Sequence, residues 1–173
     1  MTLCRLLSGA RNVLPQMQHH KLIVLYDGVC QLCATVVRFI IRRDPSSVFS
    51  FCAIQSRAAA PLLRAAAIPA EDALRSFVLL DATTGTALRR SDAALAIAAR
   101  LSGGWPWLAA ACGWVPRRAR DAVYNFVAAR RYAWFGKLGE EGDTCLPPTK
   151  KVLARRVDAE EVVEGLRRRG RRE

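Results

Sequence analysis

Residues 22–33, with the sequence LIVLYDGVCQLC, contain the features that decide the fold. Leu22–Tyr26 is a continuous apolar run with β-branched residues, and such runs are typical of strands buried on both faces of a parallel sheet. An Asp-Gly pair, which favours a tight turn, separates this run from Cys30 and Cys33. The stretch therefore predicts a strand, a turn and a helix that begins at a Cys-x-x-Cys pair.

The segments that follow alternate between helical and extended patterns. Residues 33–43 have the apolar spacing of a helix that ends before an Asp-Pro pair. Strand–helix–strand units predict parallel pairing, and a short glycine-containing turn predicts an antiparallel hairpin. The order β-α-β-α-β-β-α belongs to the α/β class and is that of the thioredoxin fold. The later elements of this core are expected at 48–54 (strand), 58–67 (helix), 77–80 and 87–89 (strands) and 93–101 (helix).

Beyond this thioredoxin-like core, the sequence predicts additional C-terminal helices. Residues 103–115 are apolar and rich in tryptophan, but this stretch is too short to span a membrane. We expect it to be buried in the core, with contact to a membrane surface as the alternative. Residues 116–134 predict a helix with proline at its start, residues 136–148 predict a loop, and residues 152–169 predict a final helix.

The two ends of the chain differ in composition from the predicted domain at 21–149. Residues 1–20 lack acidic residues and contain Arg, Ser and Leu, which suits a mitochondrial or plastid transit peptide and equally an ordinary leader. The predicted location is therefore a mitochondrion or plastid, with the cytoplasm as the alternative. Residues 150–173 form a basic tail, whose arginines at 167–169, 171 and 172 are expected to contact a partner or to be solvated.

The formal net charge of the chain is +12, and the basic residues are spread along its length. This charge favours acidic proteins, ribonucleoprotein or anionic lipid as partners. No apolar stretch is long enough to cross a membrane, and the Cys and His residues lack the paired spacing of a zinc site. We therefore expect no transmembrane segment, no bound metal and no cofactor.

The Cys-x-x-Cys pair is the candidate redox site. A spacing of three places Cys30 and Cys33 within one helical turn, close enough for a disulfide. The free N–H groups of a helix N-terminus stabilise a thiolate. We expect Cys30 to be the exposed and more readily ionised nucleophile, and Cys33 to be the shielded thiol that resolves a mixed disulfide. The alternative is a pair of small buried residues that pack the helix.

Four other positions bear on this site. Asp27 is expected to cap the first helix, with proton transfer to and from a thiol as the alternative. Cys52 and Cys112 are expected to lie in the core. Cys145 follows a Gly-Asp pair in the predicted loop, where it is a candidate partner for Cys30 or for another protein.

Several motifs resemble those of the DCC family of predicted thiol–disulfide oxidoreductases. They are LYDGVCQLC (25–33), VVRFIIRRDP (36–45), RSDAAL (90–95), VPRRARDAVYNFVAARRYAWFG (115–136) and, less closely, DTCLPP (143–148). The resemblance implies a thioredoxin-like fold, with Asp27, Cys30 and Cys33 as site residues and Cys145 as a further cysteine. The chain departs from thioredoxins in one respect, because no proline directly precedes the third predicted strand.

Three functions remain open on this basis, and one of them, a membrane-surface or chaperone-like adaptor, is indicated by the tryptophan-rich segment alone. The first is a thiol–disulfide oxidoreductase that acts on protein or small-molecule disulfides and thiols through Cys30 and Cys33. The alternative is a redox-silent, thioredoxin-like interaction module, bound through its basic surface to a large assembly such as a mitochondrial ribosome.

Overall fold

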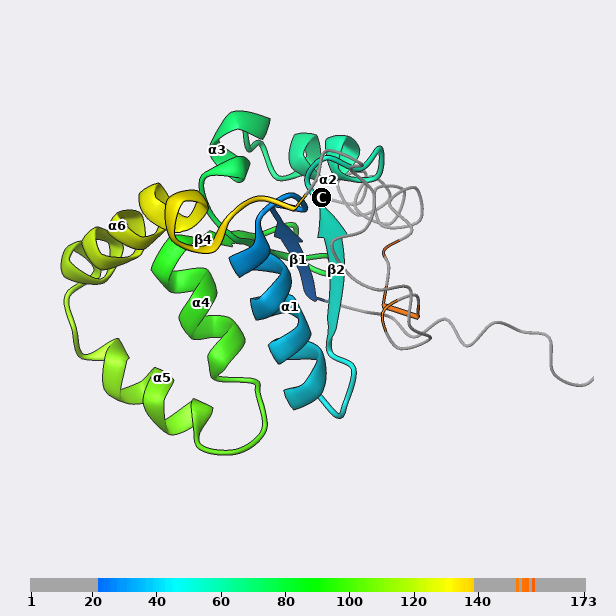
Figure 1. Cartoon of the computed structure of the whole chain (residues 1–173). Coiled ribbons are helices and arrows are strands. Elements are labelled where there is room, and N and C mark those ends of the chain that lie inside the picture. The colour runs from blue at the N-terminus through cyan, green and yellow to red at the C-terminus, as the bar shows by residue number, and fades with distance from the viewer. Residues whose placement is uncertain (1–21, 139–151, 153, 156, 158–173) are drawn as a thin grey trace, which may run out of the picture.

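The computed structural model describes residues 22–138 together with Val152, Ala154, Arg155 and Val157. Four strands form one mixed sheet in the order β2-β1-β3-β4, with helices packed around it (Figure 1). The strands are β1 (Leu22–Tyr26), β2 (Phe49–Ala53), β3 (Val78–Asp81) and β4 (Ala87–Arg89). The predicted α/β, thioredoxin-like class and the single sheet shared by the first three strands are confirmed.

Two of the three strand pairs have the predicted direction, and the third pair does not. β1 is parallel to β2, and β3 is antiparallel to β4, as expected. However, β3 is antiparallel to β1, although the intervening helical segment predicted a parallel strand. The segment after β2 contains two short helices, α2 (Ala59–Ala65) and α3 (Ala70–Leu74), in place of one helix. The break at Ile68 and Pro69 folds the chain back, so that β3 starts from the edge at which β2 ends.

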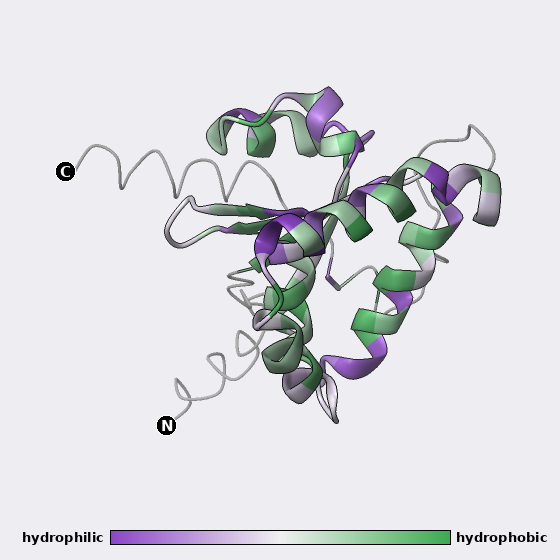
Figure 2. Ribbon diagram, turned by 90° about the vertical axis from the view of Figure 1, so that its left-hand side faces the viewer, coloured by the Kyte–Doolittle hydropathy of each residue, from purple (hydrophilic) through white to green (hydrophobic). Residues whose placement is uncertain are grey.

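Helices cover both faces of the sheet, as Figure 2 shows with the sheet seen nearly edge-on. α1 (Gln31–Arg43) and α4 (Arg90–Ala98) pack on one face, and α2 and α3 pack on the other. The strands alternate accordingly: Val24 joins the α1 side and Leu25 the α2 side, because successive side chains of a strand point to opposite faces. β1 is buried along its whole length because it lies between β2 and β3.

Two further helices extend beyond α4. They are α5 (Trp105–Gly113) and α6 (Arg117–Phe135), and the additional C-terminal helices predicted for this region are thus present. The expectation that the tryptophan-rich segment is core is wrong: Ala109 is the one buried residue of α5, and Trp107 is 82% exposed. The helix contacts α4, and Leu108 beside Trp107 is also exposed. Among the described residues, no helix is long and apolar enough to cross a membrane.

A buried ion pair ties the described C-terminal residues to the core. The Arg155 guanidinium donates from Nη1 to Asp44 Oδ2 at 3.1 Å and from Nη2 to the Asp44 carbonyl oxygen at 2.7 Å. Asp44 follows α1 and also accepts hydrogen bonds from the backbone N–H groups of Val48 and Phe49. The carboxylate thus holds the start of β2 and a residue of the predicted tail at 150–173 together. The leader at 1–20, Cys145 and the arginines at 167–172 lie outside the described residues.

This pair leads to a stability prediction. Asp44→Asn is expected to lower the free energy of unfolding by about 3–5 kcal/mol, because it leaves the buried Arg155 guanidinium without its counter-charge. Urea unfolding followed by circular dichroism measures the change. Arg64→Met, at an exposed position of α2, is the matched control and is expected to change stability by less than about 0.5 kcal/mol. Equal stability of the Asp44→Asn protein and the wild type would contradict the assignment.

Candidate active site

The two cysteines lie at the junction between the central strand β1 and helix α1. Cys30 is the residue that precedes α1, with the extended backbone angles φ −88° and ψ 120°, and Cys33 lies in the first helical turn. Their side chains approach each other to 3.3 Å, and both thiols are free. Since a disulfide requires an S–S length of about 2.05 Å, a small side-chain rotation suffices to close it.

Cys30 is not exposed, contrary to the sequence-based expectation. Its exposed fraction is 0%, whereas that of Cys33 is 6%. The chain that leaves α6 returns antiparallel to the residues before α1, and Lys137 forms a β-bridge with Cys30. The Leu138 N–H donates to the Val29 carbonyl oxygen at 2.9 Å. This returning segment, residues 136–138, covers the first cysteine.

Gly136 makes this return possible. It ends α6 with a φ of +81°, a conformation that glycine adopts without the steric cost borne by other residues. Its carbonyl oxygen then accepts a hydrogen bond from the Gln31 N–H at 3.5 Å, which is one of the N–H groups expected to be free at the start of α1. Fewer helix N–H groups are therefore available to a thiolate than the sequence indicated.

Cys33 is held in its protonated form by its surroundings. Burial raises the pKa of the Cys33 thiol, and the neighbouring Cys30 raises it further, through charge and through a hydrogen bond. Arg131 acts in the opposite direction, and the negative charge of Asp27 adds to the increase in pKa. At neutral pH, Cys33 therefore keeps its proton and shares it with the Cys30 sulfur.

Asp27 lies at the centre of a buried hydrogen-bond network instead of capping α1. Its Oδ1 accepts from the Val29 N–H at 3.2 Å and from Gln55 Nε2 at 2.7 Å. Its Oδ2 accepts from Arg131 Nη2 at 2.9 Å and from the Tyr132 hydroxyl. α1 has no side-chain cap, so the capping role expected for Asp27 is wrong. Four donors satisfy this carboxylate, and two of them come from α6.

Gly28 fits closely beside this network. Its N–H donates to Gln55 Oε1 at 2.8 Å, so one amide side chain binds both residues of the turn. A Cβ at position 28 would lie 2.9 Å from Gln55 Oε1 and 3.1 Å from the Ala53 Cβ. The absence of a side chain at this position therefore lets the turn approach the end of β2.

Arg131 and Tyr132 are site residues that sequence analysis did not identify. Arg131 is 9% exposed and also donates from Nη2 to the Leu74 carbonyl oxygen at 2.6 Å. Burial opposes its charge, but hydrogen bonds with Tyr132 and Asp27 outweigh that effect and hold the pKa of Arg131 above its ordinary value. Burial raises the pKa of Tyr132, and its hydrogen bond to Asp27 adds to the increase.

A helical spacing could have identified Arg131. Tyr124 precedes Arg131 by seven residues, so the two side chains share one face of α6. The Tyr124 hydroxyl accepts a hydrogen bond from the Phe77 N–H at 2.8 Å, directly before β3. Thioredoxins have a proline at that point, and here the segment contains no cis peptide bond and is held by α6 instead.

A cavity of about 560 Å³ borders the hydrogen-bond network formed by Asp27 and Arg131. Its walls come from α1, α4, α5, α6 and the segment 74–77, and they are mostly aliphatic and aromatic. Cys33, Asp27 and Arg131 line it, whereas Cys30 does not. The two thiols thus face different surroundings: Cys30 lies under residues 136–138, and Cys33 borders an apolar cavity.

The remaining described cysteines lie apart from the pair. Cys52 is buried on the α2 side of the sheet, as expected, and burial raises its pKa. Cys112 was expected in the core, but it is only partly buried and borders the cavity. Within the described residues, no group of His, Cys, Asp or Glu side chains has an arrangement that could bind a metal ion.

Comparison with known proteins identifies the family of this chain. The sequence model of the DCC1-like thiol-disulfide oxidoreductase family matches residues 24–137, which is well over half of the chain. The chain belongs to this family, as its motifs indicated.

Two relatives cover most of the domain. The protein YuxK of Bacillus subtilis (strain 168) is 38% identical over 133 residues, which cover 77% of this chain and 91% of YuxK. A DCC family protein of Arabidopsis thaliana, named as chloroplastic, is 36% identical over 124 residues, which cover 71% of this chain and 67% of that protein. No solved structure matches the chain.

The charges around Cys33 lead to a reactivity prediction. Asp27→Asn removes a negative charge and is expected to lower the pKa of Cys33, whereas Arg131→Met removes a positive charge and is expected to raise it. Below the pKa, alkylation by iodoacetamide changes about tenfold for each pKa unit, since only the thiolate reacts. The measurement is the alkylation rate of the Cys33 peptide by mass spectrometry at one mildly alkaline pH.

The control is Arg118→Met, which removes an exposed charge from α6. It is expected to leave the Cys33 rate unchanged. If both Asp27→Asn and Arg131→Met change the rate in the same direction, burial alone governs this thiol and the electrostatic account is wrong.

Proposed function

We propose that this chain is a thiol–disulfide oxidoreductase in which Cys30 and Cys33 alternate between a dithiol and a disulfide. The observation that carries the proposal is the approach of two free thiols to 3.3 Å at the start of α1. Membership of a family described as thiol-disulfide oxidoreductases supports the same chemistry. The substrate class is a molecule that carries a thiol or a disulfide.

The two sulfurs have different roles in the proposed exchange. Cys30, as the thiolate, attacks one sulfur of a substrate disulfide; the S–S bond breaks, and the other sulfur leaves as a thiolate. Cys33 then gives its proton to the leaving sulfur and attacks Cys30 Sγ. This step forms the Cys30–Cys33 disulfide and releases the second substrate sulfur as a thiolate. The raised pKa of Cys33 suits the thiol that reacts second.

Asp27 acts in this proposal as a positioning residue. Its two oxygens accept four hydrogen bonds, so the charge is fixed close to the pair and raises the pKa of Cys33. A proton relay through Asp27 is less compatible with these contacts, because a thiol would have to displace one of the four donors. Substrate access to Cys30 requires that residues 136–138 move away from the turn.

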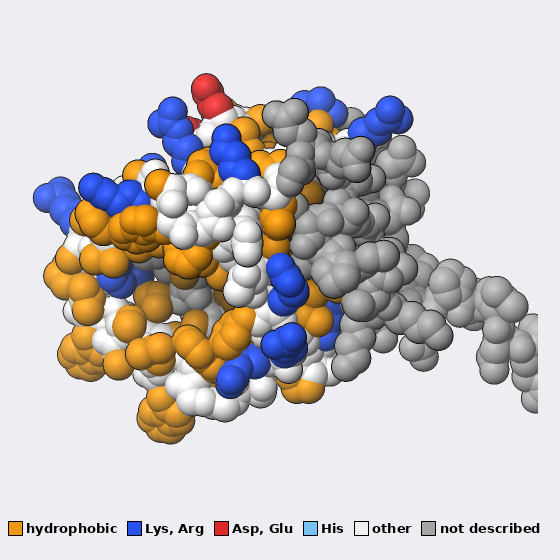
Figure 3. Space-filling model, in the orientation of Figure 1, with side chains coloured by type: hydrophobic (Ala, Val, Ile, Leu, Met, Phe, Trp, Pro, Cys, Tyr) orange, Lys and Arg blue, Asp and Glu red, His pale blue; other side chains and the backbone are white. Residues whose placement is uncertain are grey.

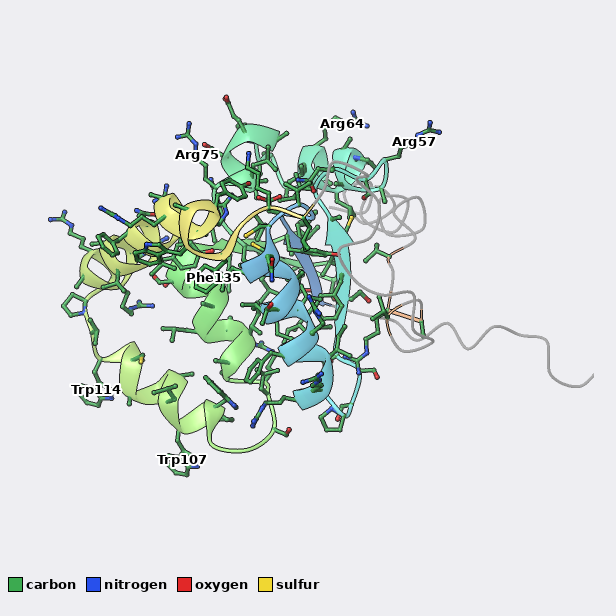
Figure 4. The ribbon with its side chains drawn as sticks, in the orientation of Figure 1. Arg57, Arg64, Arg75, Trp107, Trp114 and Phe135 are labelled. Carbon is green, nitrogen blue, oxygen red and sulfur yellow. The ribbon has the colours of Figure 1, made fainter. Side chains whose placement is uncertain are left out.

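An interaction module without redox activity is the second candidate. Cys30 is fully buried, and large apolar side chains are exposed on α5, on α6 and between them. Among them are Trp107 on α5 and Trp114 directly after it, which point outward (Figure 4). Exposed apolar patches of this kind mark binding surfaces for other macromolecules. Together with the net charge of +12, they favour docking on an acidic or ribonucleoprotein assembly.

Serine variants separate the two candidates. With glutathione disulfide as the probe, Cys33→Ser is expected to accumulate a mixed disulfide at Cys30, because the resolving thiol is absent. Cys30→Ser is expected to form neither a mixed disulfide at position 33 nor an internal one. Mass spectrometry of the intact protein measures the adduct, and Cys52→Ser is the control that should behave as the wild type. An absence of adduct in both variants would favour the interaction module.

We further propose that residues 1–20 direct import into a plastid or a mitochondrion. The absence of acidic residues before Asp27 supports this, and one relative is named as chloroplastic. A fusion of residues 1–26 to a fluorescent protein is expected to accumulate inside an organelle. Substitution of Arg5 and Arg11 by Glu, as the control, should abolish import. A diffuse cytosolic signal from the unaltered fusion would contradict the proposal.

A further inference from the structure

Helix α5 is apolar on every side, although little of it is buried. Its nine residues contain no charged side chain, and Ala109 is the only buried one. Trp105, Ala109 and Cys112 share the side of the helix that is turned toward the domain, where Trp105 packs edge-on against Phe39 of α1. A helix that is apolar all round needs apolar surroundings on its outer side as well, as in a protein core or at a membrane.

The outer side of α5 is exposed. Trp107 and Trp114, seven positions apart, lie along one line of the helix and are 82% and 90% exposed. Leu108 and Val115 directly follow them in the chain and are also exposed. Both indoles are directed away from the sheet (Figure 4), and apolar side chains gather over this helix (Figure 3). These four residues are called the outer α5 face below.

The chain around this face is basic. Residues 103–138 contain six Lys or Arg and a single acidic residue, Asp121. Arg100 precedes α5 and Arg118 follows it, and both are exposed. Within the described part of the chain, neither of them forms an ion pair, whereas Arg117 pairs with Asp92 at 2.9 Å. An apolar helix with a free positive charge before and after it is typical of helices that lie in a membrane interface.

We propose that the outer α5 face docks on the surface of an anionic phospholipid bilayer, with Trp107 and Trp114 at the level of the headgroups. Tryptophan prefers this level of a bilayer, and arginine binds lipid phosphate. A nucleic acid would attract the arginines but leave Leu108 in water. A second copy would bring two chains of net charge +12 together, whereas an anionic bilayer complements that charge.

In this arrangement the redox pair faces the water. Trp105 packs on Phe39 toward the end of α1, while Cys30 precedes the start of that helix. The thirteen residues of α1 span about 20 Å. Figure 1 shows α5 and the segment 136–138 near opposite ends of α1. The bilayer therefore leaves open the side from which a substrate reaches Cys30 in the proposed function.

Vesicles of phosphatidylglycerol mixed with phosphatidylcholine are the probe, and vesicles of phosphatidylcholine alone are the reference. Full-length protein is expected to sediment with the anionic vesicles at a lower lipid concentration than with the neutral ones. Acyl chains brominated near the headgroup quench the fluorescence of tryptophan that is inserted between the lipids. Quenching is therefore expected for the wild type, and it distinguishes insertion from attraction by charge alone.

Variants of the outer α5 face test the apolar contribution. Trp107→Ser combined with Trp114→Ser is expected to abolish the quenching and to raise the half-saturating lipid concentration about a hundredfold, about tenfold for each indole. Leu88→Ser, which removes an exposed apolar side chain from β4, is the control and is expected to bind as the wild type does. Circular dichroism confirms that each variant is folded.

Variants of the flanking arginines test the electrostatic contribution. Arg100→Gln with Arg118→Gln is expected to raise the half-saturating concentration about fivefold for each charge removed. Arg57→Gln with Arg64→Gln is the matched control, because these two exposed residues lie far from Trp107 and Trp114 (Figure 4). At physiological salt the control is expected to change binding by less than about twofold, since charges beyond about 8 Å are screened.

Three results would each overturn the proposal. The first is that neither kind of vesicle binds the wild type. The second is binding without quenching that the Trp107→Ser, Trp114→Ser variant retains, which would assign lipid binding to basic residues elsewhere in the chain. The third is a wild-type dimer in sedimentation without lipid that the same variant converts to a monomer, which would assign the outer α5 face to a second copy.

Discussion

The contact between Asp27 and Arg131 determines how the parts of this domain meet. It joins the end of the central strand β1 to helix α6, across 104 positions of the chain, at a place where both side chains are buried. Two buried charges are stable together only when each is paired and hydrogen-bonded, so α6 must lie where Arg131 reaches the carboxylate. Once α6 is placed there, Gly136 turns the chain back over Cys30, and the space beside Cys33 is enclosed as a cavity.

This arrangement gives the two thiols unequal surroundings although they are only three residues apart. Both are buried, but Cys30 lies under the returning chain and Cys33 lies beside the cavity. The Cys33 proton is retained because burial and the nearby negative charges disfavour a second thiolate. In the proposed function, the order of the two sulfurs therefore follows from the retained proton of Cys33, and access to Cys30 depends on movement of residues 136–138.

Much of the fold could be predicted from local patterns, because each pattern depends on neighbouring residues. The buried run of β1, the helix after Cys30 and the hairpin through Gly85 are of this kind. The direction of β3 and the exposure of Cys30 could not be predicted in this way, since both depend on where distant segments return. The resemblance pointed to Asp27, Cys30 and Cys33, but the partners from α6 were missed because their pairing spans most of the domain. The seven-residue spacing of Tyr124 and Arg131 carried a signal for Arg131, and the family-like motif at 115–136 contains both Arg131 and Tyr132.

The central claim is that Cys30 and Cys33 form a reversible redox pair, and an equilibrium redox titration tests it most directly. The full chain is equilibrated in buffers of stepwise glutathione or dithiothreitol potential, quenched with acid and alkylated, and the disulfide is quantified by mass spectrometry. The account predicts a single two-electron transition confined to Cys30 and Cys33, in which a tenfold change in the ratio of oxidised to reduced protein takes about 30 mV. If the two thiols remain reduced at every potential, or pair with other cysteines instead of with each other, the account is contradicted.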